Sequence, residues 1–331
     1  MGSSPFRFRF PAEWEPHKAT WLAWPHEETF GYEYRDGKEP IWIRLVEALQ
    51  DHEEVHILVQ DQNREARSRG LLKDHGVGTR NVFFHHIETD DFWIRDNGPL
   101  FVTGSDSQAV VNWRFNAWGG TYEKWERDNA VPSEIATLLK QEVFSPPVVL
   151  EGGAVDFNGK GTCLTTESVL LNPNRNPGLS RHEAEQYLGE FLGVTHTIWL
   201  PGGDFVDDPD TDGHVDLLAR FINENTAIFK LDPSCPDYKV RLENFKRLRE
   251  ATDQDGRPLN VVILPGGSPN FYISNRKVLV PTIINNNAKD EVAIEILKGF
   301  FPDRKIVGID CTKIIENGGA IHCVTMQQPA I

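Results

Sequence analysis

The sequence predicts an α/β protein in which five similar units close into a ring. Three observations support this prediction. Segments with apolar residues at helical spacing alternate with short β-branched runs, tight turns join those runs in pairs, and the order strand, hairpin, strand, helix, strand recurs at a nearly constant interval. Repeats that cannot each bury their apolar face alone must stack or close on one another. We therefore expect a closed, pseudo-fivefold arrangement of ββαβ units.

The length of 331 residues also allows two ordinary α/β domains, with a boundary near Pro146-Pro147, because proline-rich stretches often mark linkers. No Gly/Ser-rich linker lies there, so we favour a single domain over residues 1–331.

Apolar residues at helical spacing predict five helices, around 41–49, 135–139, 184–192, 242–248 and 292–300. The third helix has the clearest ends. Ser180 and Glu183 form a capping-box pattern at its start, and Gly193 follows its last apolar residue. Pro132 is expected in the first turn of the second helix, where a missing N–H is tolerated.

Short runs of β-branched and aromatic residues predict strands at 55–60, 100–103, 109–115, 163–171, 226–231, 261–264 and 277–284. Gly, Asn, Asp and Ser residues suited to tight turns predict hairpins at 104–107, 158–161, 223–225 and 274–277.

Each unit carries a polar residue that we expect to open its first strand. The intervals between these residues are 55, 63, 56 and 53, and the residues are Asp96, Glu151, His214, Asn270 and Cys323. The last unit lacks a helix, and the first helix lacks an opening hairpin. We therefore expect the C-terminal strand to pair with the N-terminal segment and complete a fifth unit. Residues 61–92 exceed one period and are expected to be an insertion.

The formal net charge of −15, without a cluster of Lys and Arg, argues against a nucleic-acid partner and favours a cationic one. No stretch approaches about 18 apolar residues, and the start lacks the apolar run of a signal peptide. We therefore expect a soluble, cytoplasmic protein without a membrane partner. The four cysteines are too scattered for a disulfide framework or a zinc site, so each is a buried apolar residue or a reactive thiol.

Equivalent positions of a closed ring converge near its axis, so the five repeated polar residues are expected to form one site. Cys323 is the candidate nucleophile, because Gly318 and Gly319 let the backbone approach a ligand. His214 and Asp216 are two residues apart, and in a strand both would point to the same face. His322 is then expected on the opposite face, with a structural role.

Asp96 and Asp216 offer paired carboxylates, which match the planar fork of donors on a guanidinium group. Glu151 is then free to orient His214. A thiol attacking the guanidinium carbon would form a tetrahedral intermediate, His214 would supply the proton that lets ammonia leave, and hydrolysis would follow.

Two other classes of function stay open. A metal-dependent hydrolase would use His214, Asp216 and either His85 or His86, but adjacent histidines in a strand point to opposite faces and cannot both ligate one ion. A non-enzymatic ring-shaped binding module is the other.

Long motifs follow one another almost from end to end of the chain, at residues 11–17, 21–26, 93–99, 115–120, 150–156, 171–177, 211–216, 270–273 and 318–329. In this order they resemble the agmatine deiminase and bacterial-type (Porphyromonas-type) peptidyl-arginine deiminase family of the guanidino-group-modifying (pentein) superfamily. The resemblance implies a five-bladed α/β propeller and no metal or organic cofactor. It also implies roles for matching residues: Cys323 as nucleophile, His214 as general acid/base, Glu151 as its partner, and Asp96 with Asp216 as the guanidinium clamp.

The same resemblance places Asn270 near the substrate and makes Trp93 an aromatic wall for the alkyl stem of the substrate, although a core position suits Trp93 equally. Residues 201–212 differ somewhat from the acidic loop of the family, and Asn317 stands where many relatives have glycine.

Agmatine is the favoured substrate, giving N-carbamoylputrescine and ammonia on the way to putrescine. The secreted peptidyl-arginine deiminase of the family resembles this chain less, since it has a signal peptide and further C-terminal domains. Conversion of protein arginine to citrulline therefore stays the alternative. Free arginine would need a cation for its carboxylate, and Arg95 and Arg114 are the candidates, although Arg95 is expected in a structural ion pair. A homo-oligomer stays possible.

Overall fold

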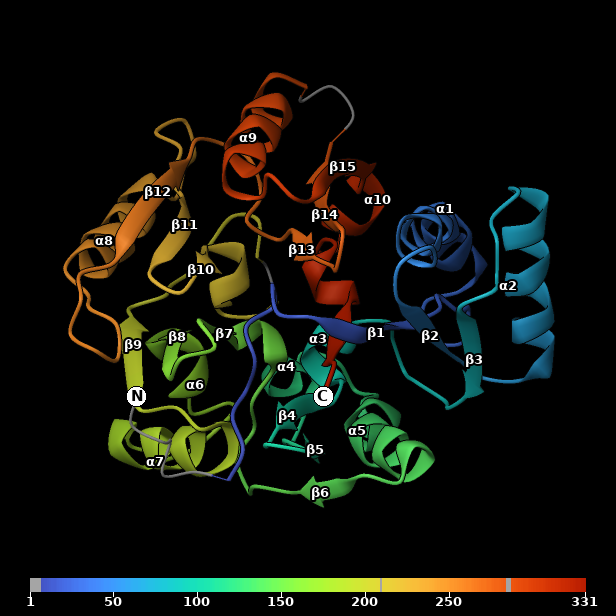
Figure 1. Cartoon of the computed structure of the whole chain (residues 1–331), viewed down its shortest axis with the longest axis horizontal. Coiled ribbons are helices and arrows are strands. Elements are labelled where there is room, and N and C mark those ends of the chain that lie inside the picture. Colours follow the sequence, from blue (N-terminus) through green and yellow to red (C-terminus); the bar gives the residue numbers. More distant parts are fainter. Residues whose placement is uncertain (1–6, 209, 284–286) are drawn as a thin grey trace.

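The computed structural model describes residues 7–208, 210–283 and 287–331, and the strands in these ranges form five sheets. One sheet has four strands, in the order β16-β1-β2-β3, and four sheets have three strands each. In Figure 1 the sheets lie around the middle of the molecule in the order in which the chain enters them. The order of the strands in each sheet therefore indicates which segments of the chain end near the middle of the molecule.

The first sheet joins the two ends of the chain. Its elements are β1 (His17–Ala23), α1 (Tyr32–Leu49), β2 (Glu54–Val59), α2 (Gln62–Asp74), β3 (Val82–His86) and β16 (Met326–Pro329). Strand β16 pairs antiparallel with β1, from His17 opposite Pro329 to Trp21 opposite Met326. The predicted pairing of the C-terminal strand with the N-terminal segment is therefore confirmed.

The other four sheets repeat one plan. The second holds β4 (Leu100–Thr103), β5 (Gln108–Val111), α5 (Glu126–Leu139) and β6 (Glu142–Phe144), and the third holds β7 (Val155–Phe157), β8 (Thr162–Thr166), α7 (Arg181–Leu192) and β9 (His196–Leu200). The fourth holds β10 (Ala219–Asn223), β11 (Thr226–Lys230), α8 (Tyr238–Arg249) and β12 (Asn260–Leu264), and the fifth holds β13 (Tyr272–Ile273), β14 (Lys277–Thr282), α9 (Asn287–Phe300) and β15 (Lys305–Asp310).

In each unit a hairpin joins two antiparallel strands, a helix follows, and the third strand runs parallel to the second. The predicted ββαβ order and the four predicted hairpins are confirmed. In the hairpin between β7 and β8, the Asn158 side chain accepts hydrogen bonds from the backbone N–H groups of Lys160 and Thr162, which is why asparagine suits this turn. Each sheet is open within the described residues, so closure into a ring stays a prediction.

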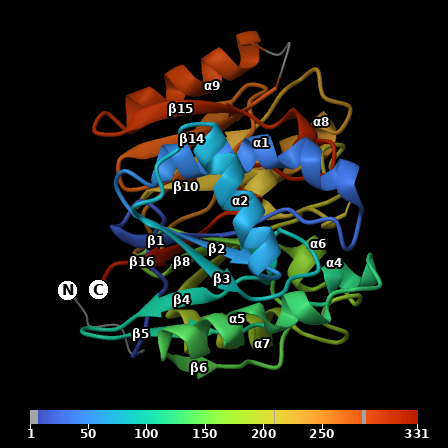
Figure 2. The same ribbon diagram turned by 90° about the vertical axis from the view of Figure 1, so that its right-hand side faces the viewer.

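The predicted insertion at 61–92 adds α2 and the edge strand β3 to the first sheet, where β3 runs parallel to β2. In Figure 2, α2 crosses in front of α1 and of this sheet. The insertion therefore enlarges one unit without separating it from the next.

Some predicted bounds were wrong. Helix α5 begins at Glu126, so Pro132 lies inside the helix and not in its first turn. Tertiary bonds hold the extra turn: the backbone N–H of Arg127 donates to Asp90 and the Asn129 side chain accepts from the backbone of Phe115.

Three strands also end earlier than predicted. Strand β5 stops at Val111, and β8 stops at Thr166, where α6 (Glu167–Leu170) begins. Strand β14 ends at Thr282, and residue 284, the predicted end of that strand, lies outside the described residues. Apolar composition alone does not reveal where a chain leaves its sheet.

The sequence predicted that the five repeated polar residues would each open a strand. This prediction was wrong. Four of them lie in or directly before a short helical turn: Asp96 in α3 (Ile94–Asn97), Glu151 before η1 (Gly152–Ala154), His214 before η2 (Val215–Leu217) and Cys323 in η3 (His322–Val324). Asn270 lies just before β13. A helical turn lets consecutive side chains point inward together, which a strand forbids.

Helix α1 packs near α10 (Thr312–Ile315), and the short α4 (Ala117–Gly120) precedes α5.

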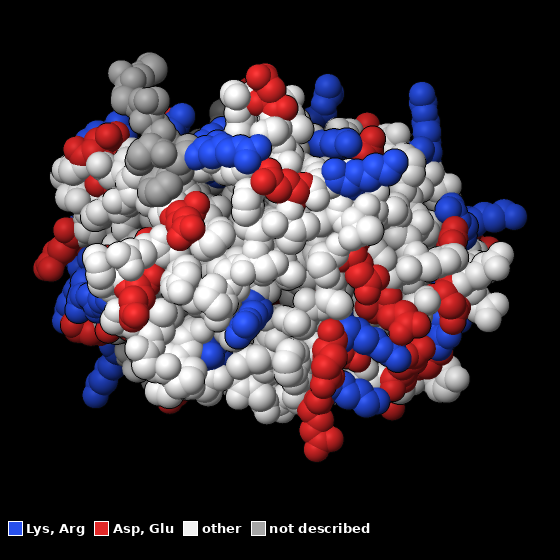
Figure 3. All heavy atoms as spheres, turned by 90° about the horizontal axis from the view of Figure 1, so that it is seen from below, with Lys and Arg blue, Asp and Glu red and all other residues white. Residues whose placement is uncertain are grey.

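No helix among the described residues is long and apolar enough to span a membrane. Figure 3 shows acidic and basic side chains intermixed over one face of the molecule, without a broad basic patch on that face.

Candidate active site

Six of the predicted side chains converge and are buried. Asp96, Glu151, His214, Asp216, Asn270 and Cys323 are each at most 5% exposed. Four short turns and the entry to β13 deliver them, one from each of the five units except that η2 supplies both His214 and Asp216. The structure therefore brings these predicted residues to one place.

His214 lies between two carboxylates. Its Nε2 is 3.5 Å from Glu151 Oε2, and its Nδ1 is 3.7 Å from Asp96 Oδ1. Nδ1 is buried and has no hydrogen-bond partner. Because Glu151 engages one nitrogen, the other is available to exchange a proton with a bound group.

The thiol of Cys323 is held beside the second aspartate. Asn270 Nδ2 donates to Cys323 Sγ over 3.2 Å and to Asp216 Oδ2 over 3.1 Å. The distance from Sγ to Asp216 Oδ2 is 3.7 Å. The other oxygen, Asp216 Oδ1, is buried without a partner. Since an unpaired buried carboxylate oxygen is costly, Oδ1 is an acceptor suited to a ligand N–H.

Gly153 keeps space open between these groups. A Cβ atom at this position would lie 2.7 Å from both Asp96 Oδ1 and His214 Nδ1. Only glycine therefore leaves room for the carboxylate and the imidazole to face each other.

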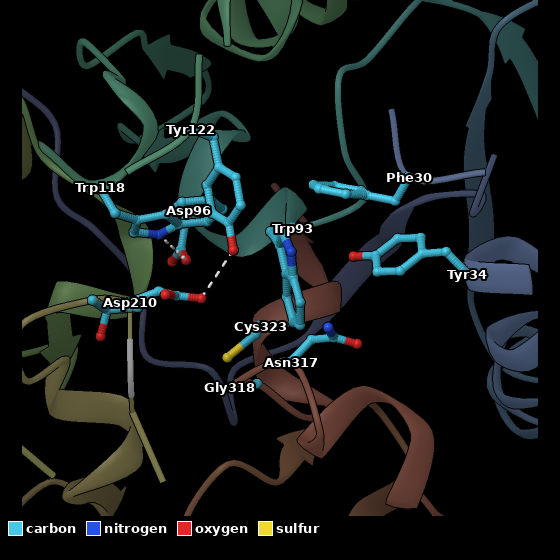
Figure 4. A pocket seen from close by; sticks show the side chains of 12 residues that line it. Phe30, Tyr34, Trp93, Asp96, Trp118, Tyr122, Asp210, Asn317, Gly318 and Cys323 are labelled. Atoms are coloured by element: carbon cyan, nitrogen blue, oxygen red, sulfur yellow. Dashed lines mark hydrogen bonds between the residues drawn. The ribbon is translucent and has the colours of Figure 1, made fainter. Parts of the chain in front are cut away.

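A cavity leads to Asp96 and Cys323 and is rich in aromatic side chains (Figure 4). Its lining consists of Phe30, Tyr34, Trp93, Asp96, Trp118, Tyr122, Asp210, Thr211, Asn317, Gly318, Gly319 and Cys323. Trp93 both lines the cavity and packs on Gly319, where an added Cβ would lie 2.2 Å from Trp93 Cζ3. Trp93 is therefore both part of the cavity wall and packed inside the protein, the two positions that the sequence left open.

Electrostatics divides the two aspartates. Burial, together with the charges of Asp216 and Glu151, raises the pKa of Asp96 to about 6. Burial also favours the neutral form of Asp216, but the hydrogen bond from His322 outweighs it and lowers the Asp216 pKa. Burial would lower the pKa of His214, yet Asp96 and Glu151 raise it to about 9, so this imidazole is protonated at neutral pH.

The surroundings of Cys323 favour its neutral thiol. Burial, followed by the charges of Asp216 and Asp96, raises the pKa of Cys323 well above its ordinary value. A cation bound between the two carboxylates would cancel those charges and favour the thiolate.

Comparisons with known proteins show the family of the chain. The family model for Porphyromonas-type peptidyl-arginine deiminase matches residues 9–329. The chain belongs to that family. An agmatine deiminase of Medicago truncatula is 34% identical, with 98% of this chain and 97% of the relative covered.

Solved structures of family members agree as well. The agmatine deiminase of Enterococcus faecalis has a TM-score of 0.87 at 31% identity, with 99% of this chain and 98% of that chain covered. A Cys-to-Ser variant of the C. jejuni agmatine deiminase with substrate bound has a TM-score of 0.85 at 27% identity, with 98% and 96% covered. The α/β fold is therefore that of the peptidyl-arginine deiminase family.

Two residues in the family motifs contact the site but were not assigned a role from sequence. Trp118 Nε1 donates to Asp96 Oδ2 over 3.0 Å (Figure 4), and Arg175 Nε donates to Glu151 Oε1 over 2.9 Å. Trp118 reaches Asp96 from a left-handed backbone, with φ of 52°, which is strained for a residue with a Cβ. The motifs 115–120 and 171–177 contain these residues and would have been the signal to follow.

The interpretation of His322 from a strand pattern was wrong. Its Nδ1 is 2.6 Å from Asp216 Oδ2, because residues 322–324 form a turn in which neighbours do not alternate between faces. Arg95 is ion-paired with Glu13 over 3.4 Å, as expected, and neither Arg95 nor the exposed Arg114 lines the cavity.

His85 and His86, the histidines considered for a metal-dependent hydrolase, have different hydrogen-bond partners. His85 Nε2 is 2.8 Å from His56 Nδ1, whereas His86 Nε2 is 2.8 Å from Glu65 Oε2. Within the described ranges no group of three or more His, Cys, Asp and Glu side chains is placed to hold a metal ion.

Proposed function

We propose that this chain hydrolyses agmatine to N-carbamoylputrescine and ammonia. One observation carries the proposal: Cys323 and Asp96 line a cavity whose lining, in the described part of the chain, contains acids and aromatics but no Lys or Arg, and Asp216 lies beside the thiol. Such a lining suits a dicationic guanidino compound and offers no cation to the carboxylate of free arginine. The relatives named agmatine deiminase support the same substrate.

In the proposed reaction, Asp96 and Asp216 hold the guanidinium, and the Cys323 thiolate attacks its central carbon. His214 gives its proton to one nitrogen of the tetrahedral intermediate, and ammonia leaves. A covalent thiouronium remains on Cys323. Neutral His214 then takes a proton from water, and the hydroxide adds to the same carbon. Collapse breaks the C–S bond and expels the thiolate, while the hydroxyl proton is released to solvent and the neutral carbamoyl group of the product remains.

The roles of the supporting residues follow from their contacts. Glu151, fixed by Arg175, holds the imidazole of His214. Asn270 places the sulfur beside Asp216, and Trp93 lies along the alkyl stem of the substrate. These assignments are proposals, and they require no metal or organic cofactor.

Asp210 is the proposed partner of the ammonium end of agmatine. It lines the cavity together with Asp96 and accepts a hydrogen bond from Tyr122 over 3.0 Å (Figure 4). A second fixed carboxylate in the same cavity complements the second charge of agmatine.

A small substrate is favoured over a protein. The ring of Phe30 packs edge-on against Tyr122, with centroids 5.8 Å apart, and both line the cavity. We expect this contact to restrict the cavity to a slender alkyl amine in preference to a peptide backbone. Peptidyl-arginine deimination is therefore the second candidate.

For the whole molecule, we propose that the five units close into a pseudo-fivefold propeller that forms one catalytic domain over residues 1–331. Strand β16 on β1 supports closure, since it joins the last unit to the first. We also propose a cytoplasmic role in putrescine and polyamine biosynthesis, without nucleic-acid or membrane partners.

The test measures ammonia release from agmatine, arginine and a blocked arginyl peptide side by side. We expect kcat/KM for agmatine to exceed the other two by at least about a hundredfold, because only agmatine offers both cations and no carboxylate or peptide. A faster reaction with the peptide would move the function to the second candidate. Cys323→Ser is the control, and we expect no measurable turnover from it, since a hydroxyl is a far weaker nucleophile.

A further inference from the structure

A second buried charged cluster lies behind the candidate site. We define the Glu13 cluster as Glu13, Arg95, Arg220 and His322, each at most 6% exposed. Its members come from the segment before β1, from α3, from β10 and from η3. The reaction proposed above uses none of them, although His322 precedes the candidate nucleophile.

Glu13 is fixed on both carboxylate oxygens. Its Oε1 accepts from the backbone N–H of Ile273 over 2.7 Å. Its Oε2 lies 2.9 Å from Arg220 Nη2 and 3.4 Å from Arg95 Nη2. Arg220 is held in turn, because its Nε donates to Asp156 over 2.8 Å. The carboxylate of Glu13 is therefore an immobile, ionised anchor.

His322 joins this anchor to Asp216. Its Nε2 is 2.9 Å from Glu13 Oε2, and its Nδ1 is 2.6 Å from Asp216 Oδ2. Ionised carboxylates only accept hydrogen bonds, so each ring nitrogen is placed to donate to one carboxylate. The backbone is held too, since the N–H of His322 donates to Asn270 Oδ1 over 3.0 Å.

The consequence concerns the two oxygens of Asp216. Oδ2 is occupied by His322 and Asn270, whereas Oδ1 is buried and unpaired. His322 thus fixes the rotation of the carboxylate and leaves one oxygen for a ligand. A carboxylate free to rotate would offer either oxygen to the thiol.

We propose that His322, anchored by Glu13, is a positioning residue that keeps Asp216 ionised and directs its Oδ1 at the guanidinium group. This inference rests on the proposed function. The charged groups that face His322 are Glu13, Asp216 and Arg95, whose Nε donates to the His322 carbonyl over 3.2 Å, with Arg220 behind Glu13.

Two substitutions test the two hydrogen bonds of the His322 ring one at a time. The amide nitrogen of asparagine lies near the place of Nδ1, and that of glutamine lies near the place of Nε2. His322→Asn therefore keeps a donor toward Asp216, whereas His322→Gln keeps one toward Glu13 and leaves Asp216 without it. His182→Gln on the exposed face of α7 is the matched control.

We expect KM for agmatine to rise at least about tenfold in His322→Gln, and about threefold or less in His322→Asn. The acid limb of kcat/KM should also move to higher pH in His322→Gln, because the hydrogen bond that favours ionised Asp216 is gone. The inference would be overturned if both substitutions changed KM equally and kept the wild-type pH profile. Such a result would indicate a packing role for His322, because packing does not depend on which hydrogen bond the substituted side chain keeps.

A double-mutant cycle covers the case in which a variant is poorly folded. In Asp216→Asn, replacing His322 by Gln should not weaken agmatine binding further, and additive losses would contradict positioning. Glu13→Gln, which keeps shape and removes charge, should shift the pH profile in the same direction as His322→Gln. If the wild type hydrolyses another guanidino compound but not agmatine, the proposed function is refuted and the inference about His322 is not. The His322 variants would then be compared with the wild type on that other compound.

Discussion

At the scale of single residues, the site depends on two aspartates in opposite environments. Asp96 is surrounded by carboxylates and by Trp118, and its pKa is raised to about 6. Asp216 receives hydrogen bonds from His322 and Asn270, and its pKa is lowered. The pair therefore loses charge one member at a time as pH falls, and Asp96 loses it first.

This difference predicts how binding depends on pH. A carboxyl group with a raised pKa is neutral below that value, so the clamp is complete above about pH 6 and incomplete below it. The dissociation constant of agmatine for Cys323→Ser, measured by calorimetry, should rise toward tenfold per pH unit below about 6. In Asp96→Asn the constant should be high and flat over this range. A flat constant between pH 5 and 7 in the Cys323→Ser protein would contradict the assignment of Asp96.

Asp210 yields a prediction about the other end of the substrate. Asp210→Asn should raise KM for agmatine about tenfold or more and leave kcat within a few-fold, because a charge-assisted bond of about 1.5–3 kcal/mol to the ammonium end of the substrate is lost. Steady-state kinetics measures both parameters. Asp204→Asn, in the same loop but exposed, is the control and should match the wild type. A selective loss of kcat would instead place Asp210 near the chemistry.

At the scale of elements, glycines and caps explain where several helices begin and end. Helix α7 begins with the Ser180–Glu183 capping box and ends at Gly193, whose φ is 70°. An added Cβ at Gly193 would lie 2.6 Å from the Phe8 carbonyl oxygen, so a turn conformation and a close approach both require glycine there. Gly70, in the interior of α2, has neither reason, since nothing lies within 4 Å of its added Cβ.

The two glycines predict opposite changes in stability. Gly70→Ala should raise the free energy of unfolding by about 0.5–1 kcal/mol, because alanine loses less backbone entropy in a helix. Gly193→Ala should lower it by more than about 1 kcal/mol, because of the left-handed backbone and the contact with Phe8. Urea unfolding followed by far-UV circular dichroism measures both, and a gain at Gly193 would refute the structural reason given for that glycine.

At the scale of the whole molecule, the two chain ends form one unit. Strands β1 and β16 pair, and the side chain of Gln328 extends the contact to the second sheet. Its Oε1 accepts from Trp21 Nε1 over 3.0 Å, and its Nε2 donates to Gln108 Oε1 over 2.8 Å. All three side chains are buried. The last strand therefore links the first sheet to the second.

Gln328→Ala should lower the free energy of unfolding by roughly 2 kcal/mol or more, because it leaves a buried indole N–H and a buried amide oxygen without this partner. Chemical denaturation monitored by tryptophan fluorescence measures the change. The exposed Gln186→Ala serves as the control and should stay within about 0.5 kcal/mol of the wild type. Equal stability of the two variants would show that the first two sheets are not coupled through Gln328.

Much of this architecture follows from local patterns. Helical spacing, turn residues and the near-constant interval predict the ββαβ units, and the capping box predicts the start of α7. The same interval predicts that five polar residues share a site, because repeats place equivalent positions together. Element bounds were less predictable: the first turn of α5 depends on bonds from Asp90, far away in the chain.

The sequence by itself determined the repeating order of elements, the family, and the identity of Asp96, Glu151, His214 and Cys323 as neighbours, since all of these depend on periodicity and residue type. Only the tertiary structure decided what surrounds them. His322 reaches Asp216 because η3 is a turn and not a strand, and Glu13 reaches His322 from 309 positions away. Charge, burial and the pKa of a carboxyl group depend on atoms brought together through space, which no local pattern encodes.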